Sequence, residues 1–140
     1  MRVLIDTNVV LDLLLDRQPF SEAASELFDR VEENSIEGFL GATTLTTLFY
    51  LAAKTTDSAT ARDQVRRLLV LCSVAPVDKS VLTEALDLGL RDFEDAVLVA
   101  AARRVDAQVL VTRNLKDFRK VGGLTIVSPA ELVESLRLRS

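Results

Sequence analysis

The residues in this sequence best suited to chemistry are carboxylates that border apolar runs. Asp6 directly follows the run VLI. Asp92, Glu94 and Asp95 lie just before the run VLVAAA at 97–102. Several carboxylates that face one crevice repel one another unless a cation neutralises them, and Mg²⁺ and Mn²⁺ prefer oxygen ligands. The pattern therefore favours metal-assisted hydrolysis, provided that the fold brings these acids together.

The residue types that are missing narrow the chemistry further. The 140 residues include no histidine and one cysteine, Cys72, which lies in the apolar run VLCSV. The lack of histidine excludes Ser-His-Asp and Cys-His nucleophile systems and imidazole-rich zinc sites. We expect Cys72 to be a buried thiol in a reducing cytoplasm, without a disulfide framework. Hydrolytic chemistry in this chain must therefore depend on carboxylates.

Each of these acids also has a purely structural interpretation. Asp92 and Asp95 are three residues apart, which places them on one helix face but also resembles a capping box. Asp6 could cap the helix that follows it, and the segment NLKD at 114–117 has the same form. The sequence leaves both interpretations open for every acid.

The elements that would position these residues follow from hydrophobic periodicity. Short apolar runs predict strands at 3–5, 36–41, 73–77, 108–112 and 124–127. Helical spacing predicts helices at 9–15, 21–34, 45–54, from 58, at 80–89, at 92–104 and from 128, with a short helical turn from 114. This alternation indicates an α/β fold with a parallel sheet covered on both faces. Sites in such sheets form at the carboxyl ends of the strands, where Asp6 and the segment TRN at 112–114 would meet.

Turn and cap residues predict several of the helix boundaries. The expected helix starts are Ser21, Thr43 or Thr44, Ser58, Asp78, Asp92 and Ser128, and Gly89 is the expected end of the helix that Asp78 begins. Ser128, Pro129 and Glu131 form the strongest start signal, with an N-cap, a proline at the first position and a glutamate at the third. The helix from 58 is expected to place one apolar face inward, formed by Val65, Leu68, Leu69 and Cys72.

Composition and charge restrict the class of protein. With 49% apolar and 27% charged residues, we expect one globular domain over residues 1–140. No apolar run reaches the roughly 18 residues of a membrane span, and the start MRVLIDTN is unlike a signal peptide, so we expect a cytoplasmic protein without a membrane partner. The net charge of −4 argues against nucleic-acid binding by bulk charge. From Arg103 onward, however, the sequence contains eight basic residues and four acidic ones. This basic segment forms either a local basic surface or a solvated loop.

Three segments together resemble PIN-domain proteins. VLIDTNVVLDLL (3–14), FEDAVLVAAA (93–102) and VLVTRNLKDF (109–118) occur in the order and approximate spacing of that family. The likeness is closest to the VapC-like ribonucleases of prokaryotic toxin–antitoxin systems. The resemblance implies a three-layer α/β/α fold with a central, mostly parallel sheet. It also implies an RNA-cleaving site with Mg²⁺ or Mn²⁺, a cognate antitoxin and a homodimer.

Carried over position by position, the resemblance assigns roles to individual residues. It makes Asp6 and Asp95 metal ligands, with Asp92 as a supporting or alternate ligand. The implied catalytic set is Asp6, Asp92, Asp95, Asn114 and Asp117. The implied supporting residues are Thr7, Asn8 and Thr112, and the implied RNA contacts are Arg113, Lys116 and Arg119. Glu94 is expected to point away from the site, because adjacent helix positions do not share a face.

Two positions depart from the family pattern. Thr47 stands where similar sequences usually carry an acid, and Gly41 replaces a usual serine. Threonine can hold a water molecule but supplies no negative charge. Three interpretations follow: an active enzyme with a weaker or rearranged site, a site completed by Asp92, or a PIN domain that binds RNA or an antitoxin without cleaving.

Two further alternatives concern surfaces and class. The apolar segment LFYLAA at 48–53 packs either into the core or against a second copy of the chain. A phosphatase-like or response-regulator-like domain would also use an aspartate at a strand end. That class needs a strand-end lysine, which the sequence does not provide, so the nuclease remains the favoured interpretation.

Overall fold

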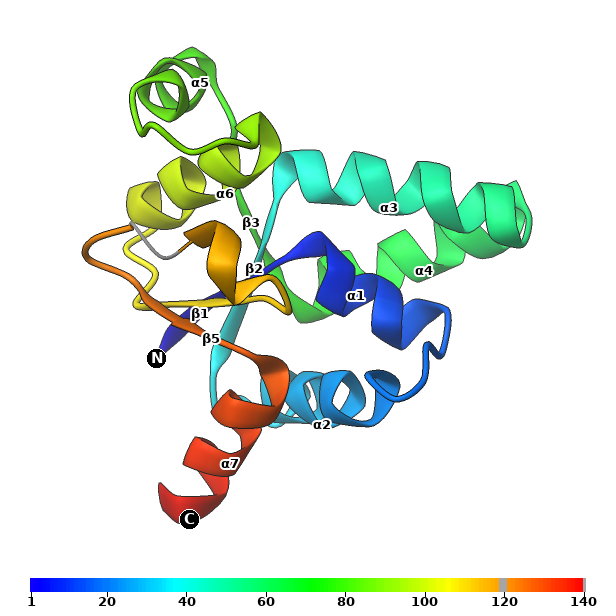
Figure 1. The fold of residues 1–140 in the computed structure, drawn as a ribbon. Helices are drawn as coiled ribbons and strands as arrows, with labels where there is room; N and C mark the ends of the chain where they lie inside the picture. The colour runs from blue at the N-terminus through cyan, green and yellow to red at the C-terminus, as the bar shows by residue number, and fades with distance from the viewer. Residues whose placement is uncertain (119–120, 140) are drawn as a thin grey trace.

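The computed structural model describes residues 1–118 and 121–139. Within these residues a single parallel sheet contains five strands in the order β3-β2-β1-β4-β5 (Figure 1). The strands are β1 (Arg2–Ile5), β2 (Glu37–Gly41), β3 (Ser73–Ala75), β4 (Val109–Val111) and β5 (Thr125–Val127). Every strand lies within a predicted one, except that β1 begins one residue earlier, at Arg2. The predicted parallel sheet is confirmed.

Helices cover both faces of this sheet (Figure 1). They are α1 (Thr7–Leu14), α2 (Ser21–Glu32), α3 (Ala42–Thr55), α4 (Ser58–Leu71), α5 (Lys79–Leu86), α6 (Phe93–Arg104) and α7 (Pro129–Arg139), with a 3₁₀ turn, η1 (Leu115–Phe118). The three-layer α/β/α architecture is therefore confirmed. In the described parts of the chain, no helix is long and apolar enough to cross a membrane.

Alternation along the central strand divides the core into two layers. Val3 and Ile5 of β1 pack with residues of α1, α2, α3, α4 and α7 on one face. Leu4 points to the opposite face, where it packs with residues of α5 and α6. All three side chains are fully buried, and complete burial of such a side chain contributes about 1.5–3 kcal/mol. A slip of one residue in this strand would exchange the two layers, so burial fixes its register.

Two of the predicted helix starts, at Asp78 and Ser128, are confirmed by side-chain caps. Asp78 accepts a hydrogen bond from the Val81 N–H at 3.0 Å and begins α5. At α7, the Ser128 hydroxyl accepts from the Glu131 N–H at 3.1 Å, and the Glu131 carboxylate accepts from the Ser128 N–H at 2.9 Å. This is the predicted capping box, and it anchors the last helix.

The prediction that Ser21 caps α2 is wrong. Phe20 occupies the cap position, without a side-chain cap bond, and already has helix-like backbone angles. The Arg17 carbonyl accepts from the N–H groups of both Phe20 and Ser21, so a preceding turn satisfies these donors. The Ser21 hydroxyl instead accepts from the Gln18 side chain at 2.9 Å.

Other boundary and burial predictions also need correction. Asp57, one residue before the predicted Ser58, caps α4 through the Thr60 N–H. Leu69 is 50% exposed, because α4 turns Leu68 and Cys72 inward and the next position lies about 100° away. Helix α5 ends at Leu86, three residues before Gly89.

One further helix start and one apolar segment complete the comparison. Helix α3 begins at Ala42 after Gly41, without a side-chain cap, so Thr43 and Thr44 lie inside its first turn. The segment 48–53 packs partly into the core: Leu48 and Ala52 are buried, while Tyr50 is 63% exposed.

Candidate active site

A small cavity of about 50 Å³ lies at the carboxyl end of the sheet. Its lining residues come from the end of β1, the start of α1 and the first two turns of α3 and α6. They are Asp6, Thr7, Thr43, Thr44, Thr47, Glu94, Asp95 and Leu98. The predicted convergence of Asp6 and Asp95 at this end of the sheet is thus present. The lining is rich in oxygen atoms, from three carboxyl groups and four threonine hydroxyls.

Asp6 both caps a helix and contributes to this cavity. It is 6% exposed, and its carboxylate accepts hydrogen bonds from the Thr7 N–H and the Thr112 hydroxyl, both at 2.7 Å. Burial raises the pKa of Asp6, the two hydrogen bonds lower it, and the nearby charges of Asp92 and Glu94 raise it further. The two bonds use one lone pair on each oxygen, so the remaining lone pairs can bind a ligand.

Thr112 connects this carboxylate to the loop after β4. The register of β1 and β4 pairs Ile5 with Val111, so the next residues, Asp6 and Thr112, lie side by side. The fully buried Thr112 hydroxyl donates to Asp6 and accepts from the Asn114 N–H at 3.0 Å. The predicted supporting residue therefore orients Asp6 and the loop at once, while the Asn114 side chain is exposed and does not line the cavity.

The other two predicted supporting residues differ in their contacts. The Thr7 hydroxyl lies 3.0 Å from that of Thr44, which joins α1 to α3 at the floor of the site. The amide oxygen of Asn8 is buried and has no hydrogen-bond partner in the described part of the chain. Asn8 does not line the cavity.

Asp95 is the acid whose ionisation the site opposes most clearly. Burial raises its pKa to about 7, with further contributions from the negative charges of Asp92, Asp6, Asp117 and Glu94. Within the described residues, the Asp95 carboxylate takes part in no hydrogen bond, so nothing but solvent neutralises it. A divalent cation in the cavity would offset this repulsion.

Asp92 and Asp117 act on the cavity from outside. The Asp92 carboxylate accepts from the Asp95 N–H at 3.1 Å and so caps α6, as the capping interpretation expects. Asp117 is exposed on η1. Both raise the pKa of Asp95 by charge, but neither lines the cavity. The structure therefore separates the predicted acids into an inner pair, Asp6 and Asp95, and an outer pair.

The prediction that Glu94 points away from the site is wrong. Glu94, Asp95 and Leu98 of α6 all line the cavity. Positions four apart lie on the same helix face, so Leu98 extends the stripe that begins at Glu94. A cavity at the first turn of a helix can contact two adjacent positions, which single-face spacing does not anticipate.

The two departures from the family pattern also lie at this site. Thr47, where the resemblance implies an acid, lines the cavity, so the lining residues of α3 contribute hydroxyls but no charge. A Cβ atom on Gly41 would lie 2.8 Å from Leu98 Cδ2. The glycine thus permits the close approach of Leu98, and the charge in the cavity comes from β1 and α6.

The donor set fits a hydrated divalent cation better than a dry metal cage. Within residues 1–118 and 121–139, no group of three or more Asp, Glu, Cys or His side chains is arranged to hold a metal directly. The pair Asp6 and Asp95 nevertheless offers oxygen donors whose pKa values are raised by burial and like charge. Mg²⁺ commonly binds through one or two carboxylates and retains several waters. The cavity therefore suits such an ion, with its remaining ligands from water.

Sequence reasoning missed a buried ion pair beside the site. Asp12 of α1 is fully buried, and Arg113 donates to it from Nε at 2.7 Å and from Nη2 at 3.2 Å. Arg17 lies 3.9 Å from the same carboxylate, and the Arg113 guanidinium stacks on Phe20 at 3.9 Å from the ring centre. A lone acid within the apolar helical run VVLDLLL was the available signal, since buried acids are rare unless paired. Of the other two predicted RNA contacts, Lys116 is exposed and Arg119 lies outside the described residues.

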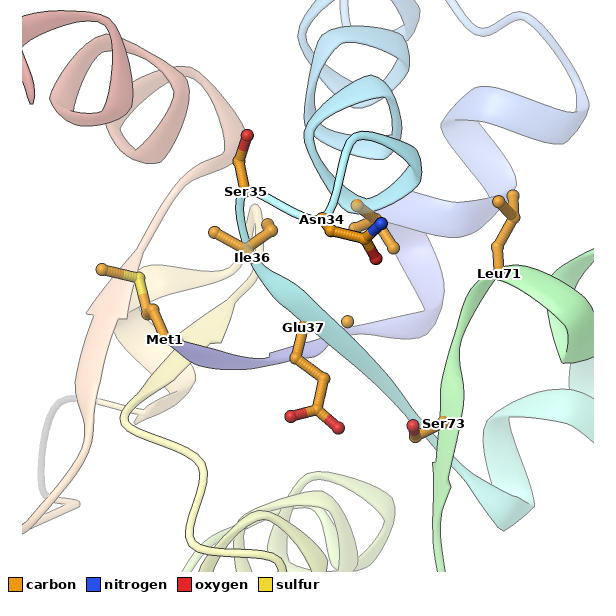
Figure 2. Close-up of a pocket in the computed structure, with 9 residues that line it drawn as sticks. Met1, Asn34, Ser35, Ile36, Glu37, Leu71 and Ser73 are labelled. Carbon is orange, nitrogen blue, oxygen red and sulfur yellow. The ribbon is translucent and has the colours of Figure 1, made fainter. Parts of the chain in front are cut away.

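A larger cavity of about 320 Å³ lies at the opposite end of the sheet (Figure 2). Figure 2 shows Met1, Glu37 and Ser73 there, at the starts of β1, β2 and β3. Glu37 forms an ion pair with Arg2 at 3.5 Å. Sites of parallel sheets form at the carboxyl ends of the strands, so the smaller cavity is the better candidate despite its size.

Known proteins support this assignment of fold. The sequence pattern of the PIN domain matches residues 2–116. VapBC-1 from nontypeable Haemophilus influenzae has a TM-score of 0.72 at 16% identity, covering 93% of this chain and 99% of that one. DNA-bound VapBC from Salmonella typhimurium has a TM-score of 0.71 at 19% identity, covering 92% of this chain and 98% of that one. VapC20 from Mycobacterium tuberculosis has a TM-score of 0.62 at 16% identity, covering 77% of this chain and 86% of that one. It is described as a toxin that cleaves the sarcin–ricin loop.

No match was found among curated proteins. The family pattern nevertheless covers most of the chain, and its matched region contains Asp6, Asp95 and Thr112. The structural neighbours share the three-layer arrangement around a parallel sheet, although their sequences have diverged widely. The chain belongs to the PIN domain family.

Proposed function

We propose that this protein is a metal-dependent endoribonuclease of the VapC toxin type, which hydrolyses RNA phosphodiester bonds with Mg²⁺ or Mn²⁺. The observation that carries the proposal is the shared cavity of Asp6 and Asp95 at the carboxyl end of the sheet, with the pKa of Asp95 raised to about 7. Ribonuclease activity is typical of the family, and one structural neighbour is described as an RNA-cleaving toxin.

The residues of the site divide the work of the reaction. Asp6, held by Thr7 and Thr112, and Asp95, which takes part in no hydrogen bond with the residues that the structure describes, would hold the ion. The bound ion supplies charge neutralisation at the phosphate and a water of lowered pKa. Asp92 or Asp117 orients the attacking water from the outer edge of the cavity. Glu94 adds the negative charge that Thr47 does not provide.

We further propose that the protein acts in the cytoplasm as one domain, as a homodimer controlled by an antitoxin. Support comes from the neighbours of known structure, which include toxin–antitoxin complexes, some bound to DNA. The buried thiol of Cys72, with its pKa raised to about 12 by burial, is consistent with a reducing compartment.

The test is cleavage of a labelled structured RNA with Mg²⁺, with Mn²⁺ and with EDTA. Asp95→Asn should abolish most of the metal-dependent cleavage. Asp106→Asn is the matched control, because Asp106 is exposed, has a left-handed backbone that asparagine tolerates, and precedes β4 at the opposite end of the sheet. Cleavage that neither EDTA nor Asp95→Asn reduces would refute the proposal.

The second candidate is a PIN domain that binds RNA or an antitoxin without cleaving. Thr47, at the position of a usual acid, is the observation that favours it. A Mn²⁺ titration separates the two functions: a folded protein without measurable Mn²⁺ affinity is a binding module, whereas a Mn²⁺ complex that Asp95→Asn weakens supports the nuclease.

A further inference from the structure

A second cavity, of about 380 Å³, opens beside the loop that carries Thr112. It lies where the starts of α2 and α7 approach each other, next to the end of β4, and these two helices pack side by side (Figure 1). Its walls include Phe20, Ala23, Arg113, Ser128, Pro129 and Ala130. The cavity is therefore mainly apolar, with a guanidinium as the charged group in its lining.

Arg113 is held in a fixed orientation at this cavity. Its Nε and Nη2 atoms donate to the buried Asp12 carboxylate, and its plane stacks on Phe20. Its side chain is 27% exposed, and within the described residues Nη1 makes no hydrogen bond. Because the side chain is already ordered, binding an anion through its free edge costs little conformational entropy.

The local charge favours an anion. Arg17 and Arg113 both lie against the Asp12 carboxylate, and Arg113 is the one charged group among the described residues that line the cavity. Glu131 is a second acid hydrogen-bonded to a lining residue, and its carboxylate accepts from the Ser128 N–H as part of the α7 cap. An apolar wall combined with one ordered cation matches a nucleotide, which offers a phosphate and an apolar ribose and base face.

Consecutive residues of the loop after β4 link this cavity to the acidic site. Arg113 directly follows Thr112, whose hydroxyl donates to Asp6. We propose that this cavity binds a nucleotide of the RNA next to the cleaved phosphate, with Arg113 on a phosphate oxygen and Phe20, Pro129 and Ala130 on the ribose or base. This inference depends on the ribonuclease function proposed above.

The test variant is Ala130→Glu, with Ala130→Gln as the uncharged control of the same size. Ala130 is exposed in the first turn of α7, where an added acid favours the helix, so the variant should fold. Truncating Arg113 is less informative, because it removes both hydrogen bonds to the buried Asp12 carboxylate and leaves it only the more distant Arg17. The probe is a fluorescein-labelled single-stranded oligoribonucleotide, with binding followed by anisotropy in EDTA so that no metal-dependent cleavage occurs.

We expect Ala130→Glu to weaken RNA binding by about tenfold and Ala130→Gln by less than about twofold. In cleavage assays with Mn²⁺, Ala130→Glu should raise KM for the oligonucleotide while kcat changes little. Equal affinities of the two variants, in a protein that cleaves RNA, would overturn this inference alone. A wild-type protein that neither binds nor cleaves RNA overturns the proposed function as well. Competition by a polyglutamate peptide as strong as that by RNA would assign the cavity to an acidic protein partner and overturn the RNA assignment.

Discussion

The raised pKa of the Asp95 carboxyl group lowers the folding stability of the protein at neutral pH. Its folded-state pKa is about 7, whereas an unfolded aspartate titrates near about 4. Since the folded state holds the proton more tightly, this group stabilises the fold fully below about pH 4, and the contribution is lost as the pH rises to 7. A metal ion would restore the loss by binding the ionised form.

We expect Asp95→Asn to raise the melting temperature at about pH 8 in EDTA and to change it little near pH 4. The gain in free energy of unfolding should be about 1–2 kcal/mol, well below the full value of the pKa shift because the group is partly solvated. Thermal unfolding at both pH values measures it, with Asp106→Asn as the control. An unchanged or lower melting temperature at pH 8 would contradict the raised pKa.

Thr47 allows the opposite experiment, in which a charge is added. We expect Thr47→Asp to tighten Mn²⁺ binding by about tenfold, because a fourth carboxylate would then line the cavity beside Asp6, Glu94 and Asp95. It should also destabilise the metal-free protein above pH 7 through added repulsion. Thr46→Asp is the matched control, since Thr46 is exposed on α3 and does not line the cavity. Isothermal titration calorimetry with Mn²⁺ measures the affinity of each variant. Equal affinities would contradict the assignment of the cavity as the metal site.

Among the elements, α1 and the loop after β4 are joined by the Asp12–Arg113 pair, 101 residues apart in the chain. We expect Asp12→Asn to lower the free energy of unfolding by about 2–3 kcal/mol, because two guanidinium groups lose a buried counter-charge. Asp63→Asn removes an exposed partner of Arg66 and should change stability within the error of urea unfolding. If both variants lowered the free energy of unfolding by similar amounts, the buried Asp12 pair would contribute no more to stability than an exposed one.

The elements also show what the sequence could predict. Strands and helices followed from periodicity, and the side-chain caps Asp78, Asp92 and Ser128 were predicted correctly, although Asp57 was missed by one residue. Ser21 was assigned wrongly because a backbone turn, which leaves no residue signature, satisfies the first donors of α2.

The same distinction applies to the site. That Asp6 and Asp95 lie together could be predicted because they border elements that a parallel sheet must bring together. Glu94 was missed because its position depends on the width of the cavity around the first turn of α6. Asp12 was missed because its partner is distant in sequence, so only the folded arrangement joins the two.

At the scale of the whole molecule, the charges impose a condition on RNA binding. The net charge is −4, and five acids lie in or around the candidate site, so the protein as a whole repels a polyanion. Attraction would come from a few local cations and from a divalent ion bound in the cavity. RNA affinity should therefore fall only modestly with salt, with a log–log slope of about −1 to −3, unlike that of a strongly basic binder.

This condition predicts that a divalent ion strengthens RNA binding itself, beyond any role in hydrolysis. At constant ionic strength, Ca²⁺ should raise the affinity of the wild-type protein for an oligoribonucleotide, measured by anisotropy on RNA that remains intact. Asp95→Asn should bind RNA more tightly than wild type in EDTA, because one repelling charge is gone, and should gain less from Ca²⁺. If Ca²⁺ strengthens binding equally in both proteins, the ion acts on the RNA or elsewhere on the surface, and the cavity of Asp6 and Asp95 does not couple metal binding to RNA binding.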